Sequence, residues 1–402
     1  MQSEKKLNRK NTKKKIKTLF LASSYPSRVE SIGGIFIKRH AEAVAKECDV
    51  YLISVIKDNS LKNGSYEFDF IKENGVFTLR FYYNSKKVFK LFSWIYKFYK
   101  YVDYYLKAYK YIVTNYHTPD IIHVNTIFPI GLFAIYLKVT KNIPYIITEH
   151  QSYYLPHLTE STYYKSKIRR IITKQVVKYS DMVTTVSEKM KTVMSDIGLK
   201  GKYQVVPNVF NKENFFYKPC PVTKKKRILH VSLLGNEKNI EGILRVIKRL
   251  KYREDFILSI AGEGENREKL EIIASKYQLS EKFIRFIGKK TEKEIGEIMR
   301  KSSFFVLFSK FENFPCVIIE ALASGLPVIS SNVGGISEYI NEKNGILVES
   351  ENEKALLEAI EFMLENYKLY DKKSIAESAV KNFSYEKVGM KFRNIYESIL
   401  DY

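Results

Sequence analysis

The sequence has few cysteines, and this scarcity limits the kinds of site that it can build. Only three occur among 402 residues, at positions 48, 220 and 316. They are far apart and form no C-x-x-C pair, so neither a disulfide framework nor a zinc site is indicated. A reducing cytoplasm is the simplest setting for such a chain.

Long apolar runs and acidic residues are also scarce. No run approaches the ~20 apolar residues of a membrane-spanning helix. The apolar stretch TLFLA that follows the basic N-terminus is too short for a signal-peptide core, so we expect a soluble or peripheral protein. Lys and Arg number 67 against 44 Asp and Glu, a formal net charge of +23. That charge implies an anionic partner, which is nucleic acid, a phosphorylated substrate or an acidic membrane face.

What the chain does contain is a regular alternation of strand-length apolar runs with helical patterns. This alternation is typical of a parallel α/β sheet. Its length predicts two domains of about 200 residues. Three prolines and a cluster of lysines interrupt the pattern between 207 and 227. The predicted units are a basic disordered tail (1–16), an N-terminal Rossmann-like acceptor-binding domain (17–207), a linker (208–226), a C-terminal Rossmann-like donor-binding domain (227–383) and a C-terminal helix (384–402) that returns to the N-terminal domain.

The segment FENFPCVIIEALASGLPVISSN, residues 311–332, carries two glutamates eight positions apart, Glu312 and Glu320. The acid pair of a glycoside hydrolase lies about 5 to 9.5 Å apart. Eight helical residues rise about 12 Å and turn the two side chains to different faces, so we expect them to contact different parts of one long ligand. Pro315 suits the first turn of a helix, where free amides form an anion site, and a phosphorylated ligand is the natural candidate. The alternative is that Glu312 is a loop residue and Glu320 an exposed helical residue.

The run from 304 to 340, FFVLFSKFENFPCVIIEALASGLPVISSNVGGISEYI, resembles the donor-binding signature of family 4 glycosyltransferases. These are retaining enzymes of the GT-B fold, in which two Rossmann-like parallel-sheet domains face a central cleft. The resemblance extends in order over roughly residues 17 to 380. The segments that carry it are SSYPSRVESIGGIFIKRHAEAVAK, YIITEHQSYY, VVPNVFNKENF, HVSLLGNEKNIEGIL and SIAGEGENREKL.

The resemblance implies a role for each matching residue. Glu312 would lie close to the donor sugar and phosphates, Glu320 would bind the ribose hydroxyls, and amides of 313–317 would hold a phosphate. On their own, a Gly-Gly pair is equally typical of a plain turn, and one histidine after a strand is often structural. The implied catalytic residues are His150 and Glu312; the implied donor-binding residues are Gly33, Gly34, Lys238, Gly262, Glu312, Asn313, Phe314, Pro315, Cys316, Val317 and Glu320.

One position departs from the family pattern. Leu233 stands where an arginine commonly supplies a second cation for the diphosphate, which leaves Lys238 alone. A leaving nucleoside diphosphate develops negative charge that cations or helix termini stabilise. We expect that Arg227, Lys289 or Lys290 compensates, or that turnover is weaker. No Asp-x-Asp stands at a strand end near these motifs, so we expect neither a metal nor another cofactor.

Two basic segments point to an anionic membrane surface. Residues 1–17 hold eight basic side chains against one acid, Glu4. Residues 86–110 are expected to form a helix with lysines on one side, which is typical of an interfacial helix. The alternative is that its apolar face packs on its own sheet. That face consists of Leu91, Ile95, Phe98, Val102, Tyr105 and Tyr109.

The resulting functional expectation is a retaining hexosyltransferase at the cytoplasmic face of the plasma membrane. It would move a sugar from a UDP- or GDP-sugar to a glycan, either a lipid-linked or a surface polysaccharide acceptor. A GT-B-fold UDP-sugar epimerase and a nucleotide-sugar-binding protein without turnover are the alternatives. A nucleic-acid partner is not expected, because the lysines are dispersed and no recognition motif occurs.

Overall fold

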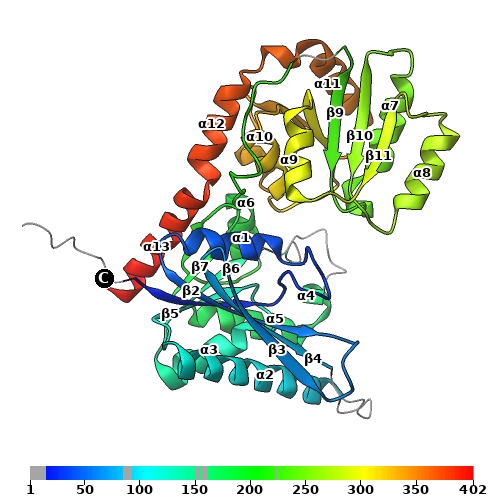
Figure 1. Ribbon diagram of the computed structural model, residues 1–402. Helices are drawn as coiled ribbons and strands as arrows, with labels where there is room; N and C mark the ends of the chain where they lie inside the picture. The colour runs from blue at the N-terminus through cyan, green and yellow to red at the C-terminus, as the bar shows by residue number, and fades with distance from the viewer. Residues whose placement is uncertain (1–14, 85–92, 151–153, 155–161, 222–223, 402) are drawn as a thin grey trace, which may run out of the picture.

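The computed structural model describes residues 15–84, 93–150, 154, 162–221 and 224–401. It consists of two α/β domains, one above the other in Figure 1. The N-terminal sheet has the strand order β3-β4-β2-β1-β5-β6-β7-β8, and the C-terminal sheet has the order β11-β10-β9-β12-β13-β14. All recorded strand pairs are parallel except β3 with β4. The predicted fold class is therefore confirmed.

In the N-terminal domain, helices alternate with the strands of an almost entirely parallel sheet. The elements are β1 (Lys17–Ala22), α1 (Ile35–Val44), β2 (Asp49–Lys57), β3 (Tyr66–Glu73), β4 (Val76–Tyr83), α2 (Ser93–Asn115), β5 (Ile121–Asn125), α3 (Gly131–Lys141), β6 (Tyr145–Glu149), α4 (Thr162–Lys165), α5 (Lys167–Tyr179), β7 (Met182–Thr185), α6 (Glu188–Asp196) and β8 (Tyr203–Val205).

The C-terminal domain repeats this alternation. Its elements are β9 (Lys226–Val231), η3 (Asn236–Lys238), α7 (Ile240–Arg249), β10 (Phe256–Ala261), α8 (Arg267–Lys276), β11 (Ile284–Gly288), α9 (Glu292–Arg300), β12 (Phe304–Leu307), α10 (Cys316–Ala323), β13 (Val328–Ser331), η4 (Ile336–Glu338), β14 (Gly345–Val348), α11 (Glu353–Asn366), η5 (Tyr367–Leu369), α12 (Lys372–Phe383) and α13 (Tyr385–Leu400).

The antiparallel edge strand β3 was not predicted. It pairs with β4 through a tight turn at Asn74 and Gly75, whose φ angles are 49° and 86°. Positive φ at both central residues is what a type I′ hairpin turn requires, and Asn-Gly supplies it at little cost. Tyr66, Phe68 and Phe70 alternate with charged residues along β3. The strand is therefore amphipathic and contains no continuous apolar run that would predict it.

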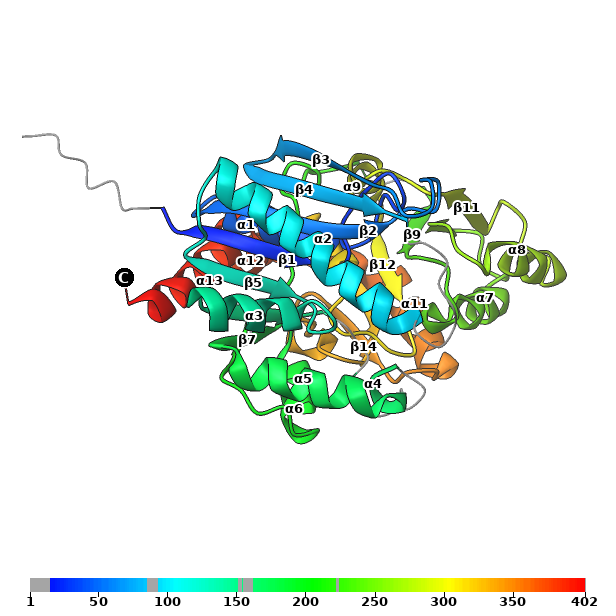
Figure 2. The same ribbon diagram turned by 90° about the horizontal axis from the view of Figure 1, so that it is seen from below.

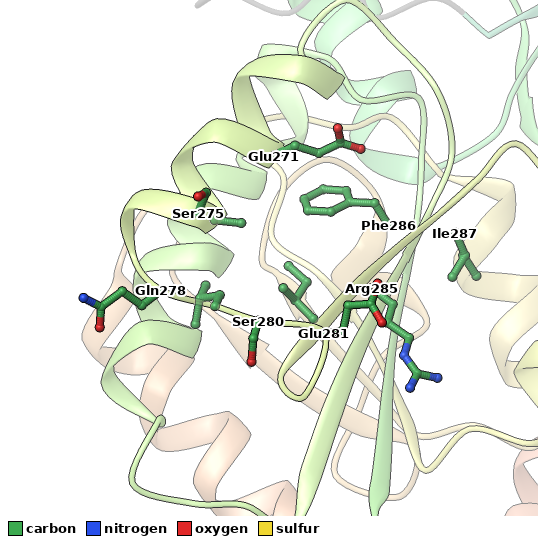
Figure 3. A pocket seen from close by; sticks show the side chains of 11 residues that line it. Glu271, Ser275, Gln278, Ser280, Glu281, Arg285, Phe286 and Ile287 are labelled. Carbon is green, nitrogen blue, oxygen red and sulfur yellow. The ribbon is translucent and has the colours of Figure 1, made fainter.

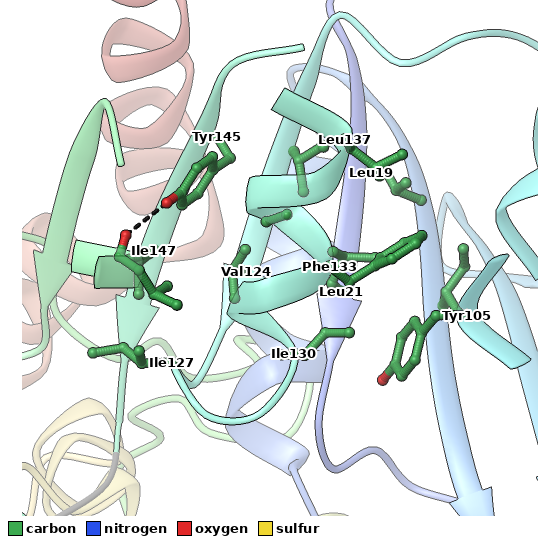
Figure 4. Close-up of a cluster of buried hydrophobic side chains, with 14 of the residues drawn as sticks. Leu19, Leu21, Tyr105, Val124, Ile127, Ile130, Phe133, Leu137, Tyr145 and Ile147 are labelled. Carbon is green, nitrogen blue, oxygen red and sulfur yellow. Dashed lines mark hydrogen bonds between the residues drawn. The ribbon is translucent and has the colours of Figure 1, made fainter. Parts of the chain in front are cut away.

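The apolar face of α2 packs on its own sheet at Tyr105 and Tyr109. Tyr105 is fully buried in one core with Leu19, Leu21 and Phe133 (Figure 4). Tyr109, 8% exposed, belongs to the same core. The interpretation of this face as a membrane-binding surface is therefore wrong for these residues; positions 86–92 lie outside the described residues. Across the described chain, no helix is both long and apolar enough to cross a bilayer.

The chain returns to the N-terminal domain at its C-terminal end. Helix α12 runs along the C-terminal domain, and α13 continues from it to pack beside α1 (Figures 1 and 2). Phe392 and Tyr396 of α13 are buried in one core with Phe20 and Val50 of the N-terminal sheet. This long crossing fixes one end of the space between the domains.

The segment between the two sheets also contacts both domains. Among its described residues, 206–221 and 224–225, there is no helix or strand. Val209 is buried in the core that holds α1 and α13. Phe210 and Phe215, only slightly further along, are buried in the core beneath α9, α10 and α12. Apolar side chains thus anchor the connection on both sides.

Candidate functional site

A cavity of about 1230 Å³ lies between the two domains. The N-terminal domain contributes the loop before α1, the face of α1 that carries Arg39, and His150. The C-terminal domain contributes the loops that follow β9, β10 and β11 and the segment from 311 to 320. In parallel α/β sheets, ligands bind beyond the carboxyl ends of the strands, and these loops lie there. All the predicted site residues except Gly33 and Gly34 line this cavity.

Gly33 and Gly34 shape the loop that forms one wall of the cavity. Gly34 precedes α1 with φ 65°, and a Cβ there would lie 2.2 Å from the carbonyl oxygen of Ser24. Only glycine fits this conformation without strain. The neighbouring side chains of Ile32 and Phe36 line the cavity instead. Gly34 therefore allows the loop to pass close to the Ser24 backbone after β1, whereas a Cβ at Gly33 would meet only the Glu30 side chain.

Gly262 has a similar role after β10. Its φ is 137°, and a Cβ would lie 1.8 Å from the carbonyl oxygen of Ser232. The loops after β9 and β10 are therefore in contact, and Leu233, 57% exposed, lies on the cavity wall beside them. The position without the expected arginine does face the cavity.

Lys238 and Glu312 form an ion pair within the cavity. The Lys238 Nζ atom lies 2.6 Å from Glu312 Oε1, and the Ser309 hydroxyl donates to the same carboxylate at 2.8 Å. Both charged side chains are largely buried. Any anionic ligand at this point must share Lys238 with Glu312.

Helix α10 begins at the cavity with Pro315 as its N-cap. In the described part of the chain, no acceptor is recorded for the amides of Cys316 and Val317, as is usual in the first turn of a helix. The Phe314 ring is 3% exposed and packs on Tyr339 at a centroid distance of 4.6 Å, so this predicted site residue serves the core. Burial raises the pKa of the Cys316 thiol to about 11, so the thiol is neutral.

Glu320 is buried against an arginine of the other domain. It is 7% exposed, and its Oε1 lies 2.6 Å from Arg39 Nη2. The alternative of an exposed helical Glu320 is therefore wrong. Burial raises the pKa of Glu320, and the charge of Arg39 and its hydrogen bond oppose that rise.

His150 approaches the cavity from the end of β6. Its ring packs on Phe36 at 4.4 Å and on His40 at 5.2 Å between centroids. Among the described residues neither ring nitrogen has a hydrogen-bond partner. Burial, with smaller contributions from His40 and His123, holds the pKa of His150 well below its usual value. The imidazole is therefore neutral and able to donate one hydrogen bond and accept another.

Three polar residues that the sequence analysis did not select connect the domains at this site. Ser187 Oγ donates to Asn313 Oδ1 at 3.2 Å, and Asn208 Nδ2 donates to the Phe314 carbonyl at 2.7 Å. The third is Arg39, which lies on the same α1 face as Ile35 and Phe36. The sequence did contain a signal for Arg39. It lies four positions after Ile35, shortly after the glycine pair, and residues four apart on a helix share a face.

The three candidate replacement cations lie in different places. Arg227 is near the amino end of β9, about 13 Å of strand before Val231, so it does not reach the cavity and cannot compensate for Leu233. Lys289 and Lys290 do line the cavity. Lys289 Nζ donates to Ser31 Oγ across the cleft at 2.9 Å, and Lys290 lies 3.5 Å from Glu294.

A second hollow, about 700 Å³, lies between α8 and β11 (Figure 3). Glu271, Phe286 and Arg285 line it, and no predicted site residue does. It lies at the outer edge of the C-terminal sheet, where β11 is the last strand. The cavity between the domains is therefore the candidate functional site.

Comparison with known proteins identifies the family. Residues 211–379 match the family described as glycosyl transferases group 1, and residues 34–214 match glycosyltransferase family 4. An uncharacterized glycosyltransferase of Methanocaldococcus jannaschii is 32% identical over 287 residues, which are 70% of this chain and 76% of that protein. The chain belongs to the family 4, group 1 glycosyltransferases.

Solved structures give the fold of this glycosyltransferase. Sucrose-phosphate synthase from Thermosynechococcus elongatus has a TM-score of 0.77 at 20% identity and covers 96% of this chain and 100% of its own. HepE of Anabaena, solved with UDP and glucose, has a TM-score of 0.71 at 15% identity, with 95% and 100% covered. The predicted GT-B fold is confirmed, and the cavity is its interdomain cleft.

Proposed function

We propose that this glycosyltransferase moves a hexose-type sugar from a UDP- or GDP-sugar to a lipid-linked or surface polysaccharide acceptor, with retention of anomeric configuration. The observation that carries the proposal is that Glu312, the start of α10 and Glu320 lie along one wall of the cleft, with His150 contributed by the other domain. These groups match, in order, the parts of an extended nucleotide sugar.

The chemistry of the wall suits such a donor. Lys238 and the amides at the start of α10 provide positive potential for a diphosphate. The Glu320 carboxylate accepts hydrogen bonds well, as a ribose diol requires. His150 is neutral and offers a hydrogen bond to the sugar or acceptor without adding charge. The acceptor hydroxyl would attack on the leaving-group side while the donor phosphate accepts its proton.

Relatives support the choice of donor and acceptor. HepE of Anabaena and TarM of S. aureus were solved with UDP, and TarM also with α-GlcNAc-glycerol and fondaparinux. The alpha-monoglucosyldiacylglycerol synthase of Streptococcus pneumoniae is 26% identical over 263 residues, 60% of this chain and 59% of that protein. Its name specifies a lipid product, which agrees with an acceptor at a membrane surface.

We further propose that the chain works peripherally at the cytoplasmic face of a membrane. Residues 1–17 carry the positive charge for this contact, although 1–14 lie outside the described residues. Each basic residue near an anionic leaflet contributes up to ~1 kcal/mol. Deleting 1–14 should weaken sedimentation with vesicles that contain an acidic phospholipid, and equal binding of both forms would contradict this part of the proposal.

The enzymatic proposal is tested by measuring release of nucleoside diphosphate from purified protein with a panel of donor sugars and lipid acceptors. We expect one donor to be turned over only with acceptor present, and NMR of the product to show the donor's anomeric configuration. A changed sugar formed from donor alone would favour an epimerase. Binding without release by folded protein would favour a nucleotide-sugar-binding protein.

A further inference from the structure

Arg39 joins the two walls of the cleft. It lies on α1 of the N-terminal domain, and its Nη2 atom contacts Glu320 at 2.6 Å and Glu292 at 2.9 Å. Both carboxylates belong to the C-terminal domain, on α10 and at the start of α9. One guanidinium nitrogen therefore links the carboxylate proposed for ribose binding to the opposite domain.

The environment of Arg39 is unusual for a structural ion pair. Its side chain is 5% exposed, and within the described residues Nε and Nη1 have no hydrogen-bond partner. A guanidinium has five N–H donors, and a buried cation is costly unless its donors are satisfied. The two carboxylate contacts of Arg39 are both made by Nη2, and both partners belong to the other domain.

We propose, on the basis of the proposed function, that Arg39 is a positioning residue for the nucleotide-sugar donor. It pairs with the Glu320 carboxylate and fixes its orientation, so that the proposed ribose-binding group is in place only while Arg39 of α1 contacts α10. Donor affinity then depends on contact between the domains. Nothing in the chemistry requires Arg39 to touch the donor itself.

The charges around Glu320 predict the direction in which its pKa should shift when each neighbour is changed. The titratable groups that act on Glu320 are Arg39 and Glu292. The Cys316 thiol and the Tyr385 phenol face Arg39 as well. Burial raises the pKa of both the thiol and the phenol, so these two are neutral near pH 7. Arg39 lowers the pKa of Glu320, whereas Glu292 raises it. Removing Arg39 and neutralising Glu292 should therefore shift the titration of Glu320 in opposite directions.

The test measures UDP and GDP affinity by calorimetry from pH 5 to 9 in the full-length protein. Arg39→Met should weaken binding about tenfold or more at pH 7 and move the pH midpoint of binding upward, because more of Glu320 is protonated. Glu292→Gln should move the midpoint downward. Arg39→Lys should recover part of the lost affinity. Arg245→Met, which breaks a pair with Glu353 outside the cleft, is the matched control and should change neither quantity.

The outcomes separate this inference from the proposed function. If the wild type binds UDP or GDP and the Arg39 and Glu292 variants keep its affinity and midpoint, the inference is overturned while the function stands. Tighter binding by Arg39→Met would mean that Arg39 competes with the ligand, which also overturns it. If the wild type binds neither nucleotide, both fail. Should Arg39→Met not fold, Glu292→Gln still tests the inference, because an unchanged midpoint in that variant would overturn it.

Discussion

Asn313, in the segment before α10, connects the C-terminal domain to the N-terminal domain by donating from Nδ2 to the backbone carbonyl of His150 at 3.1 Å. Its Oδ1 accepts from the Ser187 hydroxyl at 3.2 Å. One amide side chain thus holds together the ends of β6 and β7 and the segment that precedes α10. Asn313, which follows Glu312, is therefore held by hydrogen bonds to the N-terminal domain.

Asn313→Ala should therefore impair turnover more than folding. Each lost hydrogen bond costs about 1 kcal/mol, and the misplacement of His150 relative to Glu312 should lower kcat about tenfold or more. Nucleoside diphosphate release and thermal unfolding are the measurements. Asn344→Ala is the matched control, because Asn344 donates to the Tyr339 carbonyl at 2.8 Å within one domain. A comparable fall in kcat in both variants would contradict this role.

Lys238 and Glu312 should behave as one energetic unit. Lys238→Met leaves Glu312 buried without its cation, which should cost roughly 2 to 5 kcal/mol in donor binding and stability together. A double-mutant cycle with Glu312→Gln, followed by urea unfolding and UDP binding, measures the coupling. If the effects of the two substitutions are additive, the prediction is wrong. The exposed pair Lys310 and Glu351, 3.0 Å apart, should show almost no coupling.

Stability should fall as the pH drops from about 6.5 to 4. Burial lowers the pKa of His40 and of His230 to about 4, so both are neutral in the folded state over this range. In the unfolded state they bind protons near pH 6.5, and protonation then favours unfolding. Each contributes a loss of roughly 2 to 3 kcal/mol by pH 4. Urea unfolding at pH 7 and pH 5 should show a smaller loss in His230→Gln, and an equal loss would refute this cause.

The two-domain architecture and the cleft wall were accessible from the sequence because both depend on local signals. Strand-length apolar runs alternate with helical patterns, and Pro315 marks the start of a helix next to a strand. These features need no knowledge of distant contacts. The buried position of Glu320 was not accessible in the same way, because its partner Arg39 lies 281 positions earlier and on another domain.

Other misses have specific physical causes. The strand β3 was overlooked because Phe68 and Phe70 alternate with charged residues, although the Asn74-Gly75 turn signalled a hairpin. Arg227 was expected near the cleft because of its charge alone. It lies near the amino end of β9, whereas the cleft lies beyond the carboxyl ends of the strands. The apolar face of α2 has the same periodicity whether it meets a sheet or a membrane, so only tertiary contacts distinguish the two.

The most direct test of the proposed donor site is thermal unfolding of the wild type and Glu320→Ala with UDP, GDP, ADP and CMP and their sugars. A ligand at 100 times its dissociation constant stabilises by about 2.7 kcal/mol, which should raise the midpoint by several degrees for domains of about 200 residues. We expect a shift with one nucleotide that disappears in Glu320→Ala. No shift with any nucleotide, or an equal shift in both proteins, would contradict a nucleotide-sugar site at Glu320.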